Sequence, residues 1–335
     1  MMYVGGNNLT WTRDGIKEVK EIREGHEILC IDENGFCRWY KISSPVSIAR
    51  SKKLLHIILD KAEVLVTPSC KLCQKDKVVY AKELNIGDEL EVFSNPDFIS
   101  STMSHVSKRN RKIIHFNGYG PFVISLEKSY LLGVLSQKTY VPSLWSNGIA
   151  VLKVFSGTEN QVIDYLQKTV NDFELTAIRQ GYLWTYIEFR SNIVRLIKYL
   201  PPIDSLYHMM LKNDANAWLN FICGVIKTRG VSLEGVVRIM TRIEETLLRK
   251  LIFNLLFLHS VECSTSFSKV KNEDVCFIDV PQSEFSYIEN GKKAPKKLRP
   301  WSKIKQIFWE KSIAHNIPIE TEEHWSPVID LVLLA

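Results

Sequence analysis

Two short apolar segments decide the fold of this chain: Tyr130-Leu131-Leu132-Gly133-Val134-Leu135-Ser136-Gln137-Lys138-Thr139 and Trp218-Leu219-Asn220-Phe221-Ile222-Cys223-Gly224-Val225-Ile226-Lys227-Thr228-Arg229-Gly230. Each is an apolar run at helical spacing with one glycine in its middle, Gly133 or Gly224. A glycine lets two helix backbones approach closely. The sequence therefore predicts two helices, one from each of two repeats, that pack side by side at the centre of a domain.

Similar elements follow each apolar segment. After the first segment, the periodicity predicts strand 148–155, helix 158–171, hairpin 175–189 and helix 192–200. After the second segment, it predicts strand 236–242, helix 244–259 and strands 261–268 and 275–280. In outline, the order is αββαββα, twice.

These segments resemble the LAGLIDADG helices of homing endonucleases, which form the seam between two pseudo-symmetric halves. The resemblance implies an acidic residue at the end of each helix, because the two carboxylates hold divalent metal at the scissile phosphates. Aligning Gly133 with Gly224 places Lys138 and Arg229 at those two positions. A cation there would repel magnesium and could itself approach a phosphate. The sequence therefore predicts a degenerate nuclease site.

The first 110 residues predict an all-β module. Short alternating segments are separated by strong turn signals, including Asp14-Gly15 and Asn34-Gly35. The run 14–25 resembles the opening strand-turn unit of the Hint module of inteins and hedgehog-type autoprocessing domains. The run 66–72, followed by 81–88, resembles the second block of that module.

The resemblance to the Hint module also says what splicing would need. Its nucleophile is a Cys or Ser at the first residue of the module, and counting back places that position near Tyr3. Its second block carries a histidine after the Thr-Pro pair, where this chain has Cys70. The last residues, 329–335, resemble a late Hint strand with no following His-Asn pair, and His315-Asn316 precedes that strand. These three losses predict that the chain does not splice.

The predicted fold class is α+β. Residues 1–110 are expected to form the N-terminal part of an intein-like Hint module, and residues 111–300 a two-repeat LAGLIDADG-like domain with saddle-shaped sheets. Residues 301–335 are expected to return to the Hint module through a helix at 301–314 and strands near 318 and 328.

The composition limits the possible class of protein and its possible partners. The 335 residues are 45% hydrophobic and 24% charged, which is an ordinary globular composition with room for two domains. The 43 Lys and Arg exceed the 37 Asp and Glu for a net charge of +6, which permits a nucleic-acid partner without requiring one. No leader sequence and no apolar run near 18 residues is present. We expect a monomer with internal pseudo-two-fold symmetry, no membrane contact, and a cytoplasmic or nuclear location.

The seven cysteines raise the question of zinc. Cys70 and Cys73 form a CxxC, and Cys30 and Cys37 lie in the same module. This module therefore contains enough cysteines for a zinc site with four cysteine ligands. A turn at Asn34-Gly35 would pair Asp32 with Cys37, so Cys30 and Cys37 would not face each other across the hairpin. No metal site is therefore assigned. No cofactor is expected, except Mg²⁺ if the nuclease is active.

Two predicted strands carry candidate contacts to DNA. Alternate residues of a strand share one face, so Arg238, Met240 and Arg242 lie together, and we expect the arginines to face solvent or phosphate. The aromatic residues of another predicted strand also share a face: Tyr182, Trp184 and Tyr186. For these large side chains, packing in a core is favoured over contact with DNA.

Two basic runs supply further candidates. Each is either a solvated linker or a grip on phosphates, since clustered cations give sequence-independent affinity for the DNA backbone. The first run comprises Lys108, Arg109, Arg111 and Lys112. The second, for which the phosphate interpretation is favoured, comprises Lys292, Lys293, Lys296, Lys297 and Arg299.

The resulting hypothesis is a pseudoenzyme, an intein-derived protein that binds double-stranded DNA, does not splice and lacks metal-dependent cleavage. One alternative is an active, site-specific LAGLIDADG endonuclease whose metal ligands lie elsewhere, for instance at Asp14 or Glu244. The other is a structural or protein-interaction scaffold whose cations are solvated. Metal-dependent cleavage separates the nuclease from both other hypotheses, and salt-dependent DNA affinity separates the binder from the scaffold.

Overall fold

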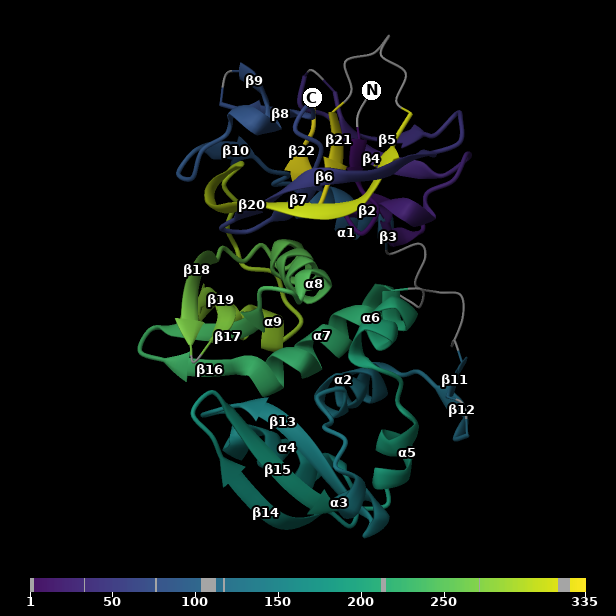
Figure 1. The fold of residues 1–335 in the computed structure, drawn as a ribbon, viewed down its shortest axis with the longest axis vertical. Coiled ribbons are helices and arrows are strands. Elements are labelled where there is room, and N and C mark those ends of the chain that lie inside the picture. Colours follow the sequence, from purple (N-terminus) through teal and green to yellow (C-terminus); the bar gives the residue numbers. More distant parts are fainter. Residues whose placement is uncertain are drawn as a thin grey trace. The chain divides into compact units, whose positions relative to one another are not determined.

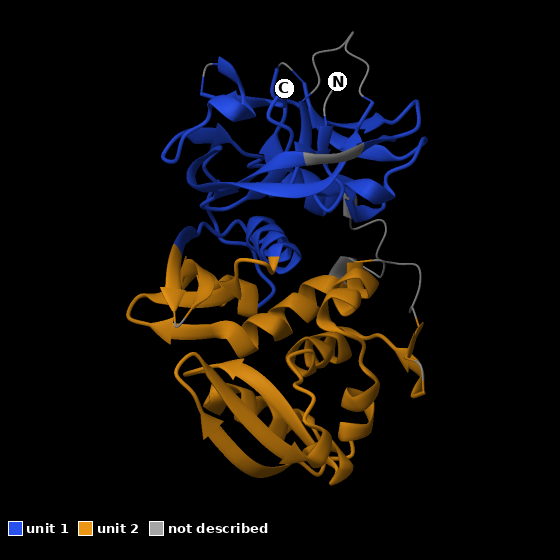
Figure 2. Cartoon of the chain, viewed as in Figure 1, with its two compact units in different colours: residues 1–106, 246–266, 290–335 blue, residues 107–245, 267–289 orange. Residues whose placement is uncertain are grey.

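The chain forms two compact units, shown in blue and orange in Figure 2. Unit 1 contains residues 1–106, 246–266 and 290–335, and unit 2 contains residues 107–245 and 267–289. The structure is a computed structural model that describes residues 3–32, 34–75, 77–103, 113–116, 118–211, 215–270, 272–318 and 326–335. Within those ranges, no helix has the length and apolar character needed to cross a membrane.

Unit 1 is built on two antiparallel sheets. In order across the sheet, the strands of the first are β1 (Tyr3–Gly5), β7 (Glu63–Val66), β6 (Ser47–Leu59), β20 (Trp301–Asn316), β10 (Glu89–Glu91), β8 (Lys71–Gln74) and β9 (Lys77–Tyr80). The strands of the second are β22 (Val332–Leu333), β21 (Ser326–Ile329), β2 (Leu9–Thr12), β4 (Glu27–Ile31) and β5 (Cys37–Lys41), with β3 (Gly15–Glu18) paired to β2. The mixture of helices and antiparallel sheets in the chain confirms the broad α+β prediction.

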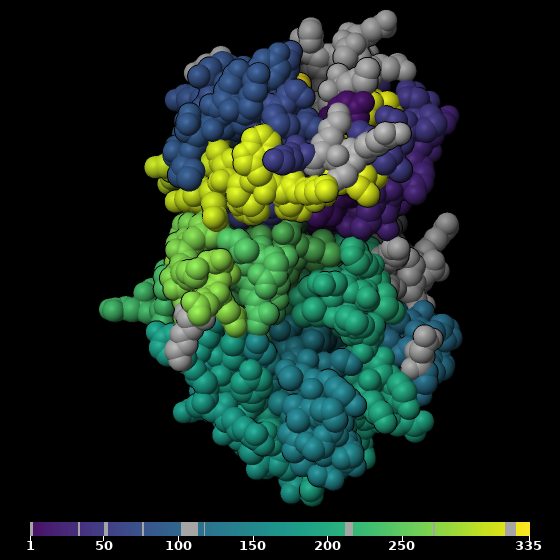
Figure 3. All heavy atoms as spheres, viewed as in Figure 1, coloured from purple at the N-terminus to yellow at the C-terminus, as the bar shows by residue number. Residues whose placement is uncertain are grey.

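The two ends of the chain share the core of unit 1. Strand β1 pairs with β20, and β2 pairs with β21. On the surface of unit 1, atoms from the C-terminal part of the chain, in yellow, accordingly lie among those from the N-terminal part, in purple and blue (Figure 3). Unit 1 therefore needs segments from both ends of the sequence.

The C-terminal segment differs from its prediction. Residues 301–316 form strand β20, so the helix expected at 301–314 is wrong. Buried Ser302 and Ile304 flank the exposed Lys303, which is the period of a strand. The spacing of Ile304, Ile307 and Phe308 also fits a helix, and the long antiparallel pairing with β6 decides between the two.

Two helices belong to unit 1, α1 (Pro96–Met103) and α8 (Thr246–Leu258), as do the 3₁₀ turns η1 (Val19–Glu21) and η2 (Ala81–Glu83). Helix α8 was expected in the second LAGLIDADG-like repeat, but the compact units place it in unit 1. Its residues 248–258 are all buried, including the polar Arg249, Lys250 and Asn254. The partners of these three side chains lie in unit 1, which explains the assignment.

Unit 2 contains two helix-and-sheet repeats (Figure 1). The first has α2 (Leu126–Leu135), α4 (Glu159–Thr169) and a sheet in the order β13 (Ile149–Phe155), β15 (Trp184–Arg190) and β14 (Glu174–Gln180). The second has α7 (Ala215–Arg229) and a sheet in the order β16 (Gly230–Leu233), β17 (Val236–Arg242), β19 (Glu273–Pro281) and β18 (Ser264–Val270), the last of which crosses the division between the units.

Several short elements of unit 2 had no counterpart in the prediction. They are β11 (Ile113–Phe116), β12 (Gly120–Val123), α3 (Pro142–Ser146), α6 (Ile203–Leu211), α9 (Gln282–Glu289) and strand β16. The helix expected at 192–200 forms as α5 (Val194–Tyr199). Each missed segment is too short to show a clear hydrophobic period.

Candidate functional site

The site of unit 2 begins where α2 crosses α7. A Cβ atom placed on Gly133 would lie 2.0 Å from the carbonyl oxygen of Phe221, and one on Gly224 would lie 2.0 Å from that of Tyr130. No side chain fits at either position, because the two backbones touch. The glycines therefore let α2 and α7 pack side by side, as Figure 1 shows.

Arg229, the last residue of α7, is buried in an ion pair with the partly exposed Glu245. Its Nη1 and Nη2 donate to Oε2 and Oε1 of Glu245 at 2.6 and 2.7 Å. Its Nε donates to Oε1 of Gln137, just beyond α2, at 3.1 Å. Only 5% of Arg229 is exposed, so its guanidinium is turned inward and is not free to approach a phosphate. The expectation that this cation could reach DNA is corrected by its packing.

The surroundings keep both members of the pair charged. Burial disfavours the guanidinium, but the Glu245 carboxylate outweighs burial and raises the pKa of Arg229. Burial likewise disfavours the carboxylate, but Arg229 outweighs it and lowers the pKa of Glu245. Glu245 also accepts a hydrogen bond from the Arg242 backbone N–H at 2.8 Å. Both oxygens of this carboxylate therefore already accept hydrogen bonds from within the protein.

Lys138 occupies the equivalent position after α2, and its ammonium group also forms hydrogen bonds within the protein. Its Nζ donates to the carbonyl oxygen of Ile197 at 2.8 Å and to that of Leu200. These carbonyls end helix α5, where a cation also complements the helix dipole. Burial lowers the pKa of Lys138. The lysine thus caps a helix within its own repeat.

Side chains of the first repeat cap the end of α7. Gln161 Nε2 donates to the carbonyl oxygens of Lys227 and Gly230 at 3.0 and 2.9 Å. Thr158 Oγ1 donates to the carbonyl oxygen of Thr228 at 3.1 Å. Nothing in the sequence signals these bonds, because they join residues about 70 positions apart.

Three cations surround the indole of Trp184 on β15. Lys153 Nζ lies 4.4 Å from the ring centroid, and the guanidinium carbons of Arg242 and Arg229 lie 5.4 and 5.6 Å from it. These are cation–π distances. Trp184 is buried and packs with Met240 of the other repeat. This aromatic residue has the core role that was favoured for it, and the cations line the edge of that core.

The other predicted aromatic residues differ from each other. Tyr182 lies before β15 and is 71% exposed. Tyr186 is partly buried and packs against the core cluster of Trp184, Met240 and Val275. The three aromatic side chains predicted to share one environment therefore do not, because the strand begins only at Trp184.

The two arginines of β17 form ion pairs on their own sheet. Arg238 donates through Nε and Nη2 to Asp279 at 2.7 and 2.8 Å, across the register of β17 and β19. Arg242 Nε lies 3.3 Å from Glu273 Oε2. About a third of each arginine side chain is exposed, 36% and 31%. A phosphate that bound there would compete with these carboxylates.

The structure describes only one of the two basic runs. Lys108, Arg109, Arg111 and Lys112 lie outside the described residues. The second run, 292–299, belongs to unit 1, and Lys293 Nζ lies 2.7 Å from Asp97 Oδ1. The buried Ala294 and Leu298 anchor this loop and leave its exposed cations at the surface: Lys292, Lys293, Lys296, Lys297 and Arg299.

Tyr3 and Cys70, which were expected at the positions of splicing groups, both lie in unit 1. The backbone N–H and Oγ1 of Thr67 donate to the Tyr3 carbonyl oxygen at 3.1 and 3.2 Å. Cys70, three residues further on, is buried, and burial raises the pKa of its thiol to about 12. A thiol in this state is not a nucleophile at neutral pH.

The candidate metal ligands do not come together in the described ranges, which contain no group of three or more His, Cys, Asp or Glu able to hold an ion. Strand pairing sets Cys30 opposite Arg38 and Cys37 opposite Ile31, one residue from the predicted register. Asp14 of unit 1 lies 3.4 Å from Lys17 Nζ, and Glu244 of unit 2 lies 3.8 Å from Arg242.

A scan against protein-family models and a search of curated proteins found no match for this chain. Among solved structures, it is similar to a bacterial intein-like domain from Clostridium thermocellum, at 18% identity over 28% of this chain and 67% of that chain, with a TM-score of 0.25. It is also similar to the homing endonuclease I-DmoI in complex with DNA and Mn, at 15% identity over 49% of this chain and 94% of that chain, with a TM-score of 0.30. Full-length DUF199/WhiA from Thermatoga maritima matches at 14% identity over 53% of this chain and 59% of that chain, with a TM-score of 0.32.

Proposed function

We propose that the chain is an intein-derived, homing-endonuclease-like protein that binds double-stranded DNA, does not splice and does not cut DNA with a metal ion. One observation carries the proposal: Arg229, at the position where the LAGLIDADG resemblance implies a metal-binding acid, is buried against Glu245. The cation takes the place of the ligand and also neutralises the neighbouring carboxylate.

The chemistry of Mg²⁺ explains why this arrangement disfavours cleavage. The ion is bound through carboxylate, carbonyl and water oxygens in a near-octahedral shell. At the end of α7 both oxygens of Glu245 accept from Arg229, and at the end of α2 the ammonium of Lys138 caps α5. An ion entering here would meet two cations and no free carboxylate of the motif.

Affinity for DNA is argued from charge and exposure. The net charge is +6, and the loop of residues 292–299 presents exposed lysines on a surface fixed by two buried apolar side chains. Such cations bind phosphates without reading sequence. The sheets of unit 2 would add contacts to base edges in a groove.

One observation favours the scaffold as a second candidate. Arg238 and Arg242, which were expected to face DNA, lie in ion pairs with Asp279 and Glu273 of the same sheet. If these pairs persist in the presence of DNA, the sheets would contribute little affinity. The basic loop would then be the main electrostatic contact.

The test incubates the purified full-length chain with a random-sequence plasmid library and Mg²⁺ or Mn²⁺, and scores both cleavage and retention on a filter at two salt concentrations. Retention that weakens with salt, without cutting, is the expected result. Site-specific cutting would establish the nuclease alternative. The absence of both signals would favour the scaffold.

A pair of charge-matched variants shows where the DNA binds. Four loop lysines are changed to glutamine in the first variant: Lys292, Lys293, Lys296 and Lys297. Four exposed lysines elsewhere in unit 1 are changed to glutamine in the control: Lys41, Lys71, Lys77 and Lys82. We expect the loop variant to lower the dependence of log affinity on log salt, and the control to change it less. Equal effects would show that net charge alone matters.

A further inference from the structure

Four ionisable side chains form a closed cluster in the core of unit 1. His56 of β6 lies with Nε2 2.5 Å from Oε1 of Glu63 on β7, and with Nδ1 2.9 Å from Oε2 of Glu310 on β20. Arg249 of α8 donates through Nε and Nη2 to Oε2 and Oε1 of Glu63 at 2.8 and 2.9 Å. His56 is 1% exposed, and Glu63 and Arg249 are fully buried.

With the carboxyls of Glu63 and Glu310 both ionised, as the lowered pKa of each indicates, the geometry requires a positive charge on His56. A neutral imidazole has one N–H donor and one nitrogen that can only accept, whereas a carboxylate can only accept. Since each ring nitrogen of His56 faces a carboxylate, only the imidazolium donates to both. With that charge present, the cluster contains two cations and two anions. Without it, the core holds an uncompensated negative charge, which is costly in a buried site.

Other groups around the imidazole act on it in opposite directions. Lys250 of α8 opposes the charge of His56, and its Nζ lies 2.7 Å from Oδ2 of Asp330. The ring of Phe308 lies 4.5 Å from the imidazole and shields it from water. Burial lowers the pKa of His56, but the hydrogen bonds to Glu310 and Glu63 outweigh burial and raise the pKa overall. Burial likewise works against the Glu63 carboxylate, but Arg249 and His56 lower its pKa to about 2.

The four members come from all three sequence segments of unit 1. His56 and Glu63 belong to residues 1–106, Arg249 to residues 246–266, and Glu310 to residues 290–335. We propose that this cluster is a pH-sensitive clasp that holds α8 and β20 against β6 and β7, and that loss of one proton from His56 loosens it. The Arg249–Glu63 and His56–Glu310 contacts join residues that are 186 and 254 positions apart in the sequence.

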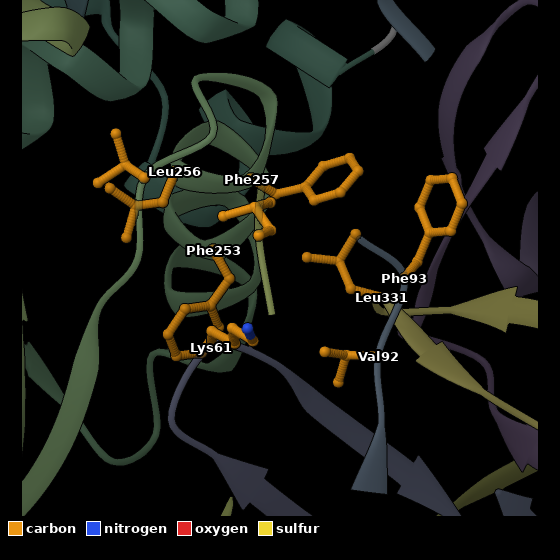
Figure 4. Close-up of a pocket in the computed structure, with 9 residues that line it drawn as sticks. Lys61, Val92, Phe93, Phe253, Leu256, Phe257 and Leu331 are labelled. Atoms are coloured by element: carbon orange, nitrogen blue, oxygen red, sulfur yellow. The ribbon is translucent and has the colours of Figure 1, made fainter. Parts of the chain in front are cut away.

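Apolar packing supports α8 independently of the clasp. The Phe93 and Phe257 rings pack at a centroid distance of 5.4 Å. Leu256, Phe257 and Leu331 line a cavity of about 10 Å³, which has room for about one water molecule (Figure 4). Loss of the proton should therefore loosen the clasp without removing α8 from the core.

The sign of the pH effect follows from the raised pKa. A group that holds its proton more tightly when folded stabilises the fold fully below its unfolded pKa, about 6.5 for histidine. That contribution is lost as the pH rises through the higher, folded pKa. Burial also raises the pKa of Asp330, to about 7. Because Asp330 also makes stability depend on pH, the contribution of His56 is measured as the difference in unfolding free energy between the native chain and a His56 variant.

The direct test is NMR of the ring nitrogens in the full-length chain, with His56 assigned by comparison with the His56→Gln variant. We expect both ring N–H groups of His56 at pH 7, and a deprotonation midpoint above 6.5. A neutral ring at pH 7, or a midpoint at or below 6.5, would overturn the proposal.

Urea unfolding between pH 6.5 and 9.5 gives the second readout. The native chain should lose stability with rising pH more steeply than His56→Gln, whereas the control His26→Gln should lose stability at least as steeply as the native chain. His26 lies in the same unit and has its pKa lowered, not raised. If His56→Gln does not fold, Glu310→Gln replaces it, since Glu310 is 35% exposed. That variant should lower the His56 midpoint, and an unchanged midpoint or equal slopes would contradict the clasp.

Discussion

Arg229 donates two hydrogen bonds to Glu245, at 2.6 and 2.7 Å, from the C-terminal end of α7. The guanidinium also reaches Gln137 beside the other motif helix. Arg229 therefore joins the two repeats. On this basis, Arg229 has a structural role at the end of α7.

Removing the guanidinium should destabilise the chain strongly. In Arg229→Met, Glu245 would be left as a buried charge without its partner, at a cost of about 3–5 kcal/mol. Urea unfolding at pH 7 measures this loss. Arg229→Asp should be at least as destabilised and should gain no magnesium-dependent cleavage. The double variant Arg229→Met, Glu245→Leu is the control, because removing both charges should recover part of the loss. A stable Arg229→Asp that cuts DNA would refute the structural role.

The glycine crossing should not tolerate a methyl group. Gly224→Ala places a Cβ 2.0 Å from the Tyr130 carbonyl oxygen, so α2 and α7 must move apart. Overpacking of this kind costs about 1–3 kcal/mol, and thermal unfolding should show a lower Tm. Lys227→Ala on the same helix should shift Tm much less. Equal Tm values for Gly224→Ala and the native chain would mean that the two helices do not touch.

Lys138 should stabilise the C-terminal end of α5. Lys138→Met removes donors to the carbonyls of Ile197 and Leu200 and should cost about 0.3–1 kcal/mol, the usual size of a charge interaction at a helix end. Faster amide hydrogen exchange in Val194–Tyr199 is the measurement. The matched control is Lys198→Met, which removes an exposed cation from the same helix end. If the control frays α5 equally, the specific cap is not needed.

The Cys70 thiol should be inert while the protein is folded. Its pKa is raised to about 12 by burial, so almost none of it is thiolate at pH 8. Alkylation with iodoacetamide followed by peptide mass spectrometry should leave Cys70 unmodified in the native chain and label it in urea. The partly buried Cys37 provides an internal comparison of exposure. Rapid native labelling of Cys70 would reveal an open or activated site.

The sequence by itself determined the features that depend on local pattern. An apolar run with one glycine predicts a helix that packs closely, and α2 and α7 meet at Gly133 and Gly224. The turn signal at Asn34-Gly35 predicts a hairpin, and β4 pairs with β5 around it, one residue away from the register that a two-residue turn would give. Such signals succeed because the period of the side chains and the preferences of turn residues act over a few positions.

Only the tertiary structure decided where the charges go and which unit each element joins. A lysine or arginine looks the same in sequence whether it faces solvent, phosphate or a buried acid, so the pairing of Arg229 with Glu245 was not predictable. The strand at β20 depended on pairing with β6, and the place of α8 depended on the buried partner of Arg249, Glu63. These contacts join residues far apart in the chain, and their free energy outweighs local preference.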